Sequence, residues 1–264
     1  MKDINFLKEH GVNVDKSLEL FGDMEIYNET MRDYLEGIDE KKSLLAKYKE
    51  LNDWANYAIY AHSIKSDARY LGFEEIAAIC LEHEMAGKEN NSSFILSDYD
   101  RIVSAADKMT DIVSEYLEGE GNTTQEANVT PTETAAEDKP IVIIADDSDL
   151  VSNFAANMLG DSYNIVTAKD GKEVLDIVNT AKYKIACLLL DLNMPNVGGF
   201  QVLDYFKENN LFAKIPVSII TGENAKESID KVFGYGIVDM LEKPFSKDDI
   251  KRVVEKTIRS ANIL

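Results

Sequence analysis

The chain has 264 residues, of which 45% are hydrophobic and 29% are charged, a composition typical of a globular protein large enough for two domains. Its formal net charge of −20 argues against sequence-independent attraction to nucleic acids or anionic membranes, because both carry charge of the same sign. The opening segment MKDINFLKEHG has no apolar signal core, and no apolar run approaches the ~18 residues of a membrane span. We therefore expect a cytoplasmic protein with neither nucleic acid nor membrane as a partner.

The first 118 residues show helical periodicity and no alternating strand pattern. In FEEIAAICLEHEM, apolar side chains recur at i, i+3, i+4, i+7 and i+8, namely at Phe73, Ile76, Ala77, Cys80 and Leu81. Glycines are expected to separate the helices at Gly11, Gly37, Gly72 and Gly87. Long helices with short connections predict an all-α antiparallel bundle over residues 1–118. Both cysteines fall in apolar segments, so we expect them to be buried and unreactive.

Residues 119–139, GEGNTTQEANVTPTETAAEDK, contain almost no large apolar side chain. Such a segment cannot bury enough surface to offset the entropy lost on ordering, so it is predicted to be a flexible linker. Its root-mean-square span would be roughly 25 Å, which permits contact between the two halves without requiring it.

Residues 140–264 alternate short apolar runs with amphipathic segments. The runs are IVIIA, NIVTA, IACLLL, PVSIIT and GIVDML, and each is followed by a helical stretch. Continuous apolar strands separated by helices predict a doubly wound α/β domain, with a five-stranded parallel sheet covered on both faces.

Polar side chains follow four of these strands. Asp146 and Asp147 come after the first strand, Asp191 after the third, Thr221 after the fourth and Lys243 near the end of the fifth. The carboxyl ends of parallel strands share one edge of the sheet, so these side chains should converge. Carboxylates about 4 Å apart repel by roughly 4 kcal/mol per pair at an effective dielectric of about 20, so the cluster calls for a cation. Oxygen ligands of this kind suit Mg²⁺.

The competing interpretation is that these acids cap helices. Asp147 or Ser148 could be the N-cap of a helix beginning near Leu150, but this accounts for one acid and not for the whole set. With a metal bound, Asp191 would be a nucleophile toward a phosphoryl group, its charge balanced by Mg²⁺ and Lys243. The Thr221 hydroxyl would hydrogen-bond the phosphoryl group, and the neighbouring Gly222 leaves room for a donor.

A histidine in the helical half has a basic setting. In YAHSIKSDARYLG, a polar stripe predicted to be exposed contains His62, Lys65, Ser66 and Arg69, and the opposite face is predicted to be buried through Ala58, Ala61, Ile64, Ala68 and Leu71. Positive charge beside an imidazole is what a phosphorylated histidine needs. The alternative is an ordinary solvated face. Two further histidines, His10 and His83, lack this setting and are predicted to lie on the surface.

The residues from about 140 to 260 resemble the receiver domain of bacterial response regulators. The resemblance rests on the acidic pair Asp146 and Asp147, on LLLDLNMP, on IITG and on EKPF. It implies a flavodoxin-like fold, Asp191 as phospho-acceptor, a cis peptide before Pro244, and Mg²⁺ held by Asp147, Asp191 and the backbone carbonyl of Asn193, with Asp146 acting through water. The chain departs from the family at Met240, where an aromatic residue is usual.

About the first 118 residues resemble a histidine-containing phosphotransfer (HPt) domain, through AHSIKSDARYLG and LEHEMAGKEN. The resemblance implies a four-helix bundle with the reactive His62 on a central helix, and Lys65 and Ser66 stabilising its phosphoryl group. Ser66 replaces the glycine that commonly follows the lysine in this family.

These features together predict a two-component phosphorelay protein. A phosphoryl group would pass between His62 and an aspartate, either Asp191 or an acceptor in another protein. No nucleotide-binding motif is present, so the phosphate would come from a sensor histidine kinase or another phosphorelay protein. The protein would not be an enzyme, beyond catalysing its own phosphorylation and dephosphorylation. One alternative is a phosphorylation-regulated binding module in which His62 is unused. Another is a metal-dependent phosphatase, but DDSDL lacks the arrangement DxDx[TV] that it would need.

Overall fold

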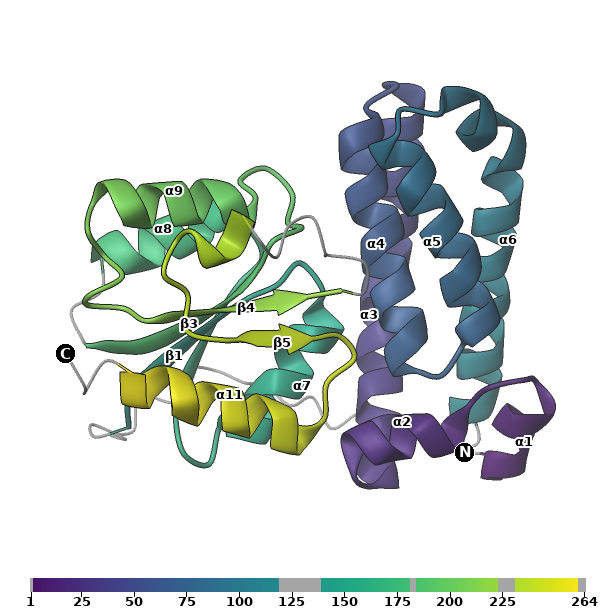
Figure 1. Ribbon diagram of the computed structural model, residues 1–264. Helices are drawn as coiled ribbons and strands as arrows, with labels where there is room; N and C mark the ends of the chain where they lie inside the picture. The colour runs from purple at the N-terminus through teal and green to yellow at the C-terminus, as the bar shows by residue number, and fades with distance from the viewer. Residues whose placement is uncertain (1, 119–138, 181–183, 223–230, 261–264) are drawn as a thin grey trace.

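The computed structural model describes residues 2–118, 139–180, 184–222 and 231–260, which form a helical part and an α/β part (Figure 1). The helical part, residues 2–118, contains α1 (Ile4–Glu9), α2 (Val14–Phe21), α3 (Met24–Glu50), α4 (Trp54–Tyr70), α5 (Glu74–Lys88) and α6 (Ser92–Leu117). Nearly all of the predicted linker lies outside the described residues. Within the described ranges, no helix has the length and apolar character needed to cross a membrane.

Helices α3 to α6 pack side by side as the predicted bundle (Figure 1). Their starts are set by capping side chains: Asp23 accepts from two backbone amides of α3, Asp53 from one of α4 and Asn91 from one of α6. Between α4 and α5, Gly72 has φ of +84°, and a Cβ there would lie 2.7 Å from the backbone oxygen of Asn13. Only glycine fits this tight turn.

Two of the glycines expected between helices lie inside them. Gly37 lies in the middle of α3, so the prediction of a break there is wrong. A single glycine costs a helix only about 1 kcal/mol relative to alanine, which the packing of this 27-residue helix offsets. Gly87 lies in the last turn of α5, where a Cβ would come within 2.8 Å of the Ala58 Cβ. Its role is therefore the close approach of α5 to α4.

The α/β part, residues 139–260, contains the five predicted strands: β1 (Ile141–Ala145), β2 (Asn164–Ala168), β3 (Ile185–Asp191), β4 (Val217–Thr221) and β5 (Met240–Glu242). All neighbouring strands pair in parallel, in the order β2-β1-β3-β4-β5. This is the flavodoxin-like order, as expected. The last strand is much shorter than the apolar run GIVDML and starts at Met240, which is half-buried.

Helices cover both faces of the sheet (Figure 1). One face is covered by α7 (Asp149–Leu159) and α11 (Lys247–Ser260), and the other by α8 (Gly171–Thr180) and α9 (Gly199–Glu208). The N-cap of α7 is Ser148, whose side chain accepts from the amide of Val151. Of the two N-cap residues considered, Ser148 is therefore the one that caps the helix, and Asp146 and Asp147 lie before it, outside the helix.

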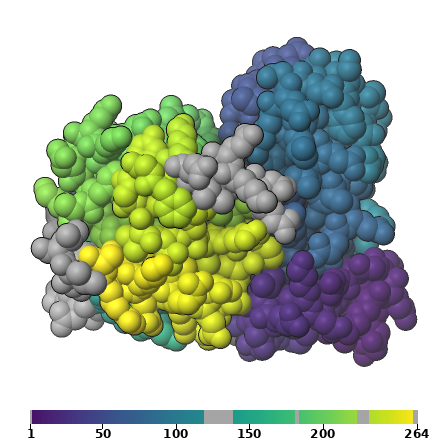
Figure 2. All heavy atoms as spheres, in the orientation of Figure 1, coloured from purple at the N-terminus to yellow at the C-terminus, as the bar shows by residue number. Residues whose placement is uncertain are grey.

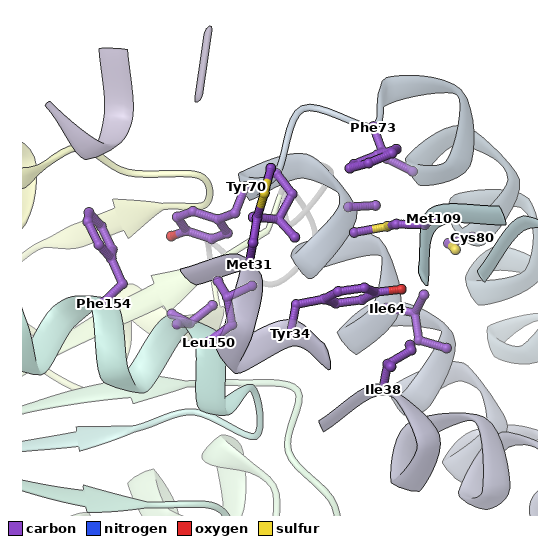
Figure 3. Packing of buried hydrophobic residues seen from close by; sticks show 14 of the residues in the cluster. Met31, Tyr34, Ile38, Ile64, Tyr70, Phe73, Cys80, Met109, Leu150 and Phe154 are labelled. Carbon is purple, nitrogen blue, oxygen red and sulfur yellow. The ribbon is translucent and has the colours of Figure 1, made fainter. Parts of the chain in front are cut away.

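The two parts share one hydrophobic core. Phe21 and Tyr70 of the helical part pack against Phe154 and Phe245 of the α/β part, with ring centroids 4.9 Å apart for Phe21 and Phe154 and 5.7 Å apart for Tyr70 and Phe245. All four side chains are buried. Figure 3 shows Tyr70 extending from α4 toward Phe154 on α7. In Figure 2 the two parts adjoin, with the N-terminal helices (purple) next to the C-terminal helix (yellow).

Candidate functional site

The three acids and the lysine converge at the carboxyl edge of the sheet. Carboxylate oxygens of Asp146, Asp147 and Asp191 all lie within 4.8 Å of one another. The Lys243 ammonium group lies 2.6 Å from a carboxylate oxygen of Asp146 and also pairs with Asp191. Thr221 ends the neighbouring strand β4 and is buried. The predicted convergence is thus confirmed for the three acids and Lys243, while the Thr221 hydroxyl donates to the backbone oxygen of Gly222 at 3.2 Å.

The site carries more negative than positive charge. Burial raises the pKa of Asp147 to about 8, and the charge of Asp146 contributes; burial likewise raises the pKa of Asp146 to about 6. Burial lowers the pKa of Lys243, but the carboxylates of Asp146 and Asp191 outweigh it and raise this pKa above its ordinary value. One ammonium group therefore faces three acids, and a further cation would relieve the excess.

The residues present fit a magnesium ion. The donors are carboxylate oxygens, which Mg²⁺ prefers, and Asp147 Oδ1 is buried without a hydrogen-bond partner among the described residues. Asp191 Oδ1 accepts the backbone N–H of Asn193 at 2.9 Å, which fixes the carboxylate and brings the next loop to the site. The predicted cis peptide between Lys243 and Pro244 is also present.

His62 lies in a buried position, contrary to the sequence-based expectation. On its predicted exposed stripe, His62, Lys65 and Ser66 are 1–4% exposed, and Arg69 is half-buried. The opposite face of α4 is buried as predicted, so the helix is enclosed on both sides over residues 61–68. The amphipathic pattern identified the polar face correctly, but it could not show that α5 and the α/β part cover it.

Glu84 of α5 holds the imidazole, and sequence reasoning missed it. Its Oε1 lies 2.9 Å from Nδ1 of His62, and its Oε2 accepts from the Lys65 ammonium group at 2.5 Å. The Lys65 ammonium group lies farther from Nδ1, at 3.3 Å. Since a carboxylate only accepts hydrogen bonds and makes the shorter contact, we assign the proton to Nδ1 and a lone pair to Nε2. The sole sequence signal was the pair Glu84 and Lys88 at i and i+4, which indicates a helix surface and not a contact across helices.

The free nitrogen of His62 faces the α/β part. Its Nε2 is buried and has no hydrogen-bond partner among the described residues. If Gly222 carried a Cβ, that atom would lie 3.0 Å from Cε1 and 3.7 Å from Nε2 of His62. Burial lowers the pKa of His62, so the ring is neutral near pH 7. A neutral imidazole thus lies beside the glycine that directly follows Thr221.

Two more residues of α4 contact the same edge of the sheet. Asp67 accepts a hydrogen bond from the Ser148 hydroxyl at 2.8 Å, and its other oxygen accepts from the ammonium group of Lys41 on α3 at 2.5 Å. The hydroxyl oxygen of Tyr70 accepts from the backbone N–H of Phe245 at 3.3 Å. Neither Asp67 nor Tyr70 was a candidate from the sequence, because only the fold brings α4 to this edge.

The other histidines differ from each other. His10 is exposed, as predicted. His83 is fully buried, so its predicted surface position is wrong; its Nδ1 lies 2.8 Å from the Tyr57 hydroxyl and its Nε2 lies 3.3 Å from Asp98. The stripe Ile76, Cys80 and His83, at i, i+4 and i+7, marks the buried face and could have revealed it. Both cysteines are buried, as expected.

A cavity of about 300 Å³ lies beside the histidine. Its lining comes from both parts of the chain, with Ala58, Ile59, His62, Gly87 and Lys88 on one side and Asn193 on the other. Asp191 is not among its lining residues. The cavity therefore gives solvent a path to the imidazole, but not directly to the buried acid.

Comparisons with known proteins identify both parts. The family model described as the response regulator receiver domain matches residues 142–255, and the Hpt domain model matches residues 24–114. Cell cycle response regulator CtrA of Brucella ovis is 29% identical over 119 residues, which cover 45% of this chain and 50% of the relative. CtrA of Brucella abortus strain 2308 gives the same values. The chain spans about half the length of these curated relatives.

Solved receiver structures are similar to part of this chain. The receiver domain of the Francisella response regulator 1452 is 30% identical and covers 46% of this chain and 99% of its own, with a TM-score of 0.41. Chemotaxis response regulator CheY4 of Vibrio cholerae is 24% identical, with coverage of 46% and 99% and a TM-score of 0.42. Receiver and Hpt domains are signalling modules and not classical enzymes, and together they indicate two-component phosphorelay signalling. Residues 24–114 of this chain thus match the Hpt domain family, and residues 142–255 match the response regulator receiver domain family.

Proposed function

We propose that this chain is a phosphorelay protein in which a phosphoryl group passes directly between His62 and Asp191 of the same molecule. The observation that carries the proposal is the position of His62, whose unpartnered Nε2 faces Gly222 beside the acidic site. Burial lowers the pKa of His62, and the charge of Asp191 opposes this effect more weakly. The donor for which Gly222 leaves room would then be a residue of the chain itself.

The transfer balances without a proton donor. From phosphorylated His62, a carboxylate oxygen of Asp191 attacks phosphorus, a P–O bond forms, and the P–Nε2 bond breaks with its electron pair returning to Nε2. Nδ1 keeps its proton, which it donates in a hydrogen bond to Glu84, so the imidazole leaves as a neutral ring. In the reverse direction the Nε2 lone pair attacks the acyl phosphate on Asp191, and the same proton remains in place.

Charged groups lie on both sides of the transfer path. Lys243, held by Asp191, would stabilise the phosphoryl oxygens on the receiver side, and the Thr221 hydroxyl would donate to one of them. On the histidine side, Lys65 would stabilise the phosphoryl oxygens, together with the adjacent residue Ser66. Mg²⁺, held by Asp147, Asp191 and the backbone carbonyl of Asn193 with Asp146 through water, would supply the positive charge that the acidic cluster lacks.

The wider setting is part of the same proposal. Phosphate would enter the chain from a sensor histidine kinase or another phosphorelay protein in the cytoplasm, and neither nucleic acid nor membrane would be a partner. The chain would divide into an Hpt domain at 1–118, a linker at 119–139 and a receiver domain at 140–264. The buried site shared by His62 and Gly222 favours this relay over a binding module in which His62 is unused.

Chemical stability of the phosphorylated residue tests the proposal. With ³²P-labelled acetyl phosphate and Mg²⁺, the wild type should carry acid-stable label on Asp191 and base-stable label on His62. His62→Gln should keep only the acid-stable label, and Asp191→Asn should lose both, because His62 receives its phosphate from Asp191. His10→Gln, at an exposed histidine, is the matched control and should behave as wild type.

Two results would count against this proposal. Base-stable label that persists in Asp191→Asn would show that His62 is filled independently of the aspartate. Label that never reaches His62 in the wild type would leave only the binding module. Intramolecular transfer also requires that the rate from Asp191 to His62 does not change when the protein is diluted tenfold.

A further inference from the structure

We propose that the hydrogen bond between Asp67 and Ser148 is a latch that determines which phosphoryl donors can reach Asp191. This inference rests on the proposed function. With the latch closed, α4 covers the acidic site and His62 is the donor in place. With the latch open, the α/β part can separate from α4, and external donors gain access to the aspartate.

Helix α4 contacts three of the loops that border Asp191. His62 lies against Gly222 after β4, Asp67 bonds Ser148 after β1, and Tyr70 bonds the backbone of Phe245 after β5. The exposed fraction of Asp191 is 0%. The cavity beside His62 reaches the fourth loop at Asn193, but it does not reach Asp191. Among the described residues, Asp191 is thus enclosed, with α4 lying against the loops around it.

The Asp67 contact differs from the others in strength and direction. Both Asp67 and Ser148 are at most 1% exposed, and the ammonium group of Lys41 lies 2.5 Å from the Asp67 carboxylate in this buried position. A hydrogen bond to a charged group is among the stronger ones, and breaking it in a buried site leaves groups without partners. The hydrogen bond that Tyr70 accepts from the backbone of Phe245 is longer, at 3.3 Å, and involves no charged group. The latch thus fixes where α4 lies on the edge of the sheet.

Ser148→Asp gives the sharpest test in the full-length chain. Aspartate is as good an N-cap as serine, so α7 should keep its start, but a second carboxylate would now face Asp67. Loss of a charged hydrogen bond should shift the balance toward the open form by about tenfold or more. We expect the initial rate of labelling of Asp191 by acetyl phosphate to rise by about tenfold, and the radius of gyration in X-ray scattering to increase.

Three further variants make the test specific. Ser148→Gly removes the hydroxyl while glycine is tolerated as an N-cap, and should give the same change more weakly. Adding Asp67→Asn to Ser148→Asp restores a donor opposite the new carboxylate and should return the rate to within about threefold of wild type. Ser162→Asp places the same charge on an exposed site of the α/β part and should change neither rate nor radius.

The outcomes separate the latch from the proposed function. Equal labelling rates and equal radii for wild type, Ser148→Asp and Ser148→Gly would overturn the latch, even if phosphate still moves between His62 and Asp191. If Ser148→Asp fails to fold, Ser148→Gly decides. Absence of label on Asp191 in every variant, including Ser162→Asp, would instead overturn the proposed function, and the scattering radius alone would then decide whether the contact holds the two parts together.

Discussion

Replacing Glu84 by glutamine removes a buried negative charge while keeping the size of the side chain. The carboxylate contacts the imidazole of His62 and the ammonium groups of Lys65 and Lys88. Burial raises the pKa of Glu84, but its contacts with His62 and Lys65 outweigh burial and hold that pKa below its usual range. Glutamine would still accept a hydrogen bond from Nδ1, but it would leave the buried Lys65 without a counter-charge.

Both reactivity and stability should fall. As Nε2 gains a phosphoryl group, positive charge develops on the ring, and the Glu84 carboxylate stabilises it. A hydrogen bond to a charged group contributes about 1.5–3 kcal/mol, so transfer from Asp191 to His62 should slow by roughly 10-fold to 150-fold. Lys65 is 1% exposed, and breaking a buried ion pair typically costs about 3–5 kcal/mol. Because glutamine can still accept a hydrogen bond, the free energy of unfolding should fall by an amount near the lower end of this range.

Rapid-quench measurement of base-stable label tests the first effect, and urea unfolding followed by circular dichroism tests the second. Glu82→Gln is the matched control, because Glu82 lies on the same helix with its side chain 47% exposed and pairs with Arg101 at the surface. Such a pair contributes at most about 1 kcal/mol. If Glu84→Gln transferred phosphate as fast as Glu82→Gln, the argument that the carboxylate stabilises the charged ring would be refuted.

Three other perturbations have defined outcomes. Gly222→Val should lower transfer to His62 by more than tenfold while Asp191 is still labelled by acetyl phosphate, because even a Cβ would lie 3.0 Å from the imidazole; labelling of His62 at the wild-type rate would contradict this. Burial raises the pKa of Asp33 to about 6, so the folded state binds this proton more tightly than the unfolded state. The contribution of this group to stability should therefore decline as pH rises from about 4 to about 6, and Asp33→Asn should flatten that part of the melting-temperature profile, whereas Asp15→Asn, at an exposed site, should not. MgCl₂ should raise the melting temperature of the wild type by mass action, with EDTA reversing the shift, and Asp147→Asn should reduce it.

The acidic site could be predicted from the sequence because its geometry follows from local patterns. Each apolar run is long enough for a buried strand, and a parallel sheet brings the ends of those strands to one edge. Asp146, Asp191 and Lys243 therefore converge wherever the helices around them lie. The short strand β5 and the continuous α3 through Gly37 depart from expectation, because packing and not propensity set the ends of these elements.

The surroundings of His62 could not be predicted in the same way. Helical periodicity assigns a residue to a face, but it does not say what covers that face. Glu84 is separated from His62 by the turn at Gly72, and the contact of Asp67 with Ser148 joins residues 81 positions apart in the chain. Contacts of this kind depend on how two elements dock, which no local pattern in one sequence specifies.

Helix α4 is buried over eight consecutive residues, 61–68, with no solvent-facing side. Most surface helices tolerate substitution every three or four positions, where their side chains point to water. Over residues 61–68 we expect no such periodicity of tolerated positions. A systematic survey of variants should find every position intolerant, because substitutions on one side would disrupt packing within the bundle and those on the other would disrupt packing against the receiver edge. Two selective pressures would thus meet on a single helix.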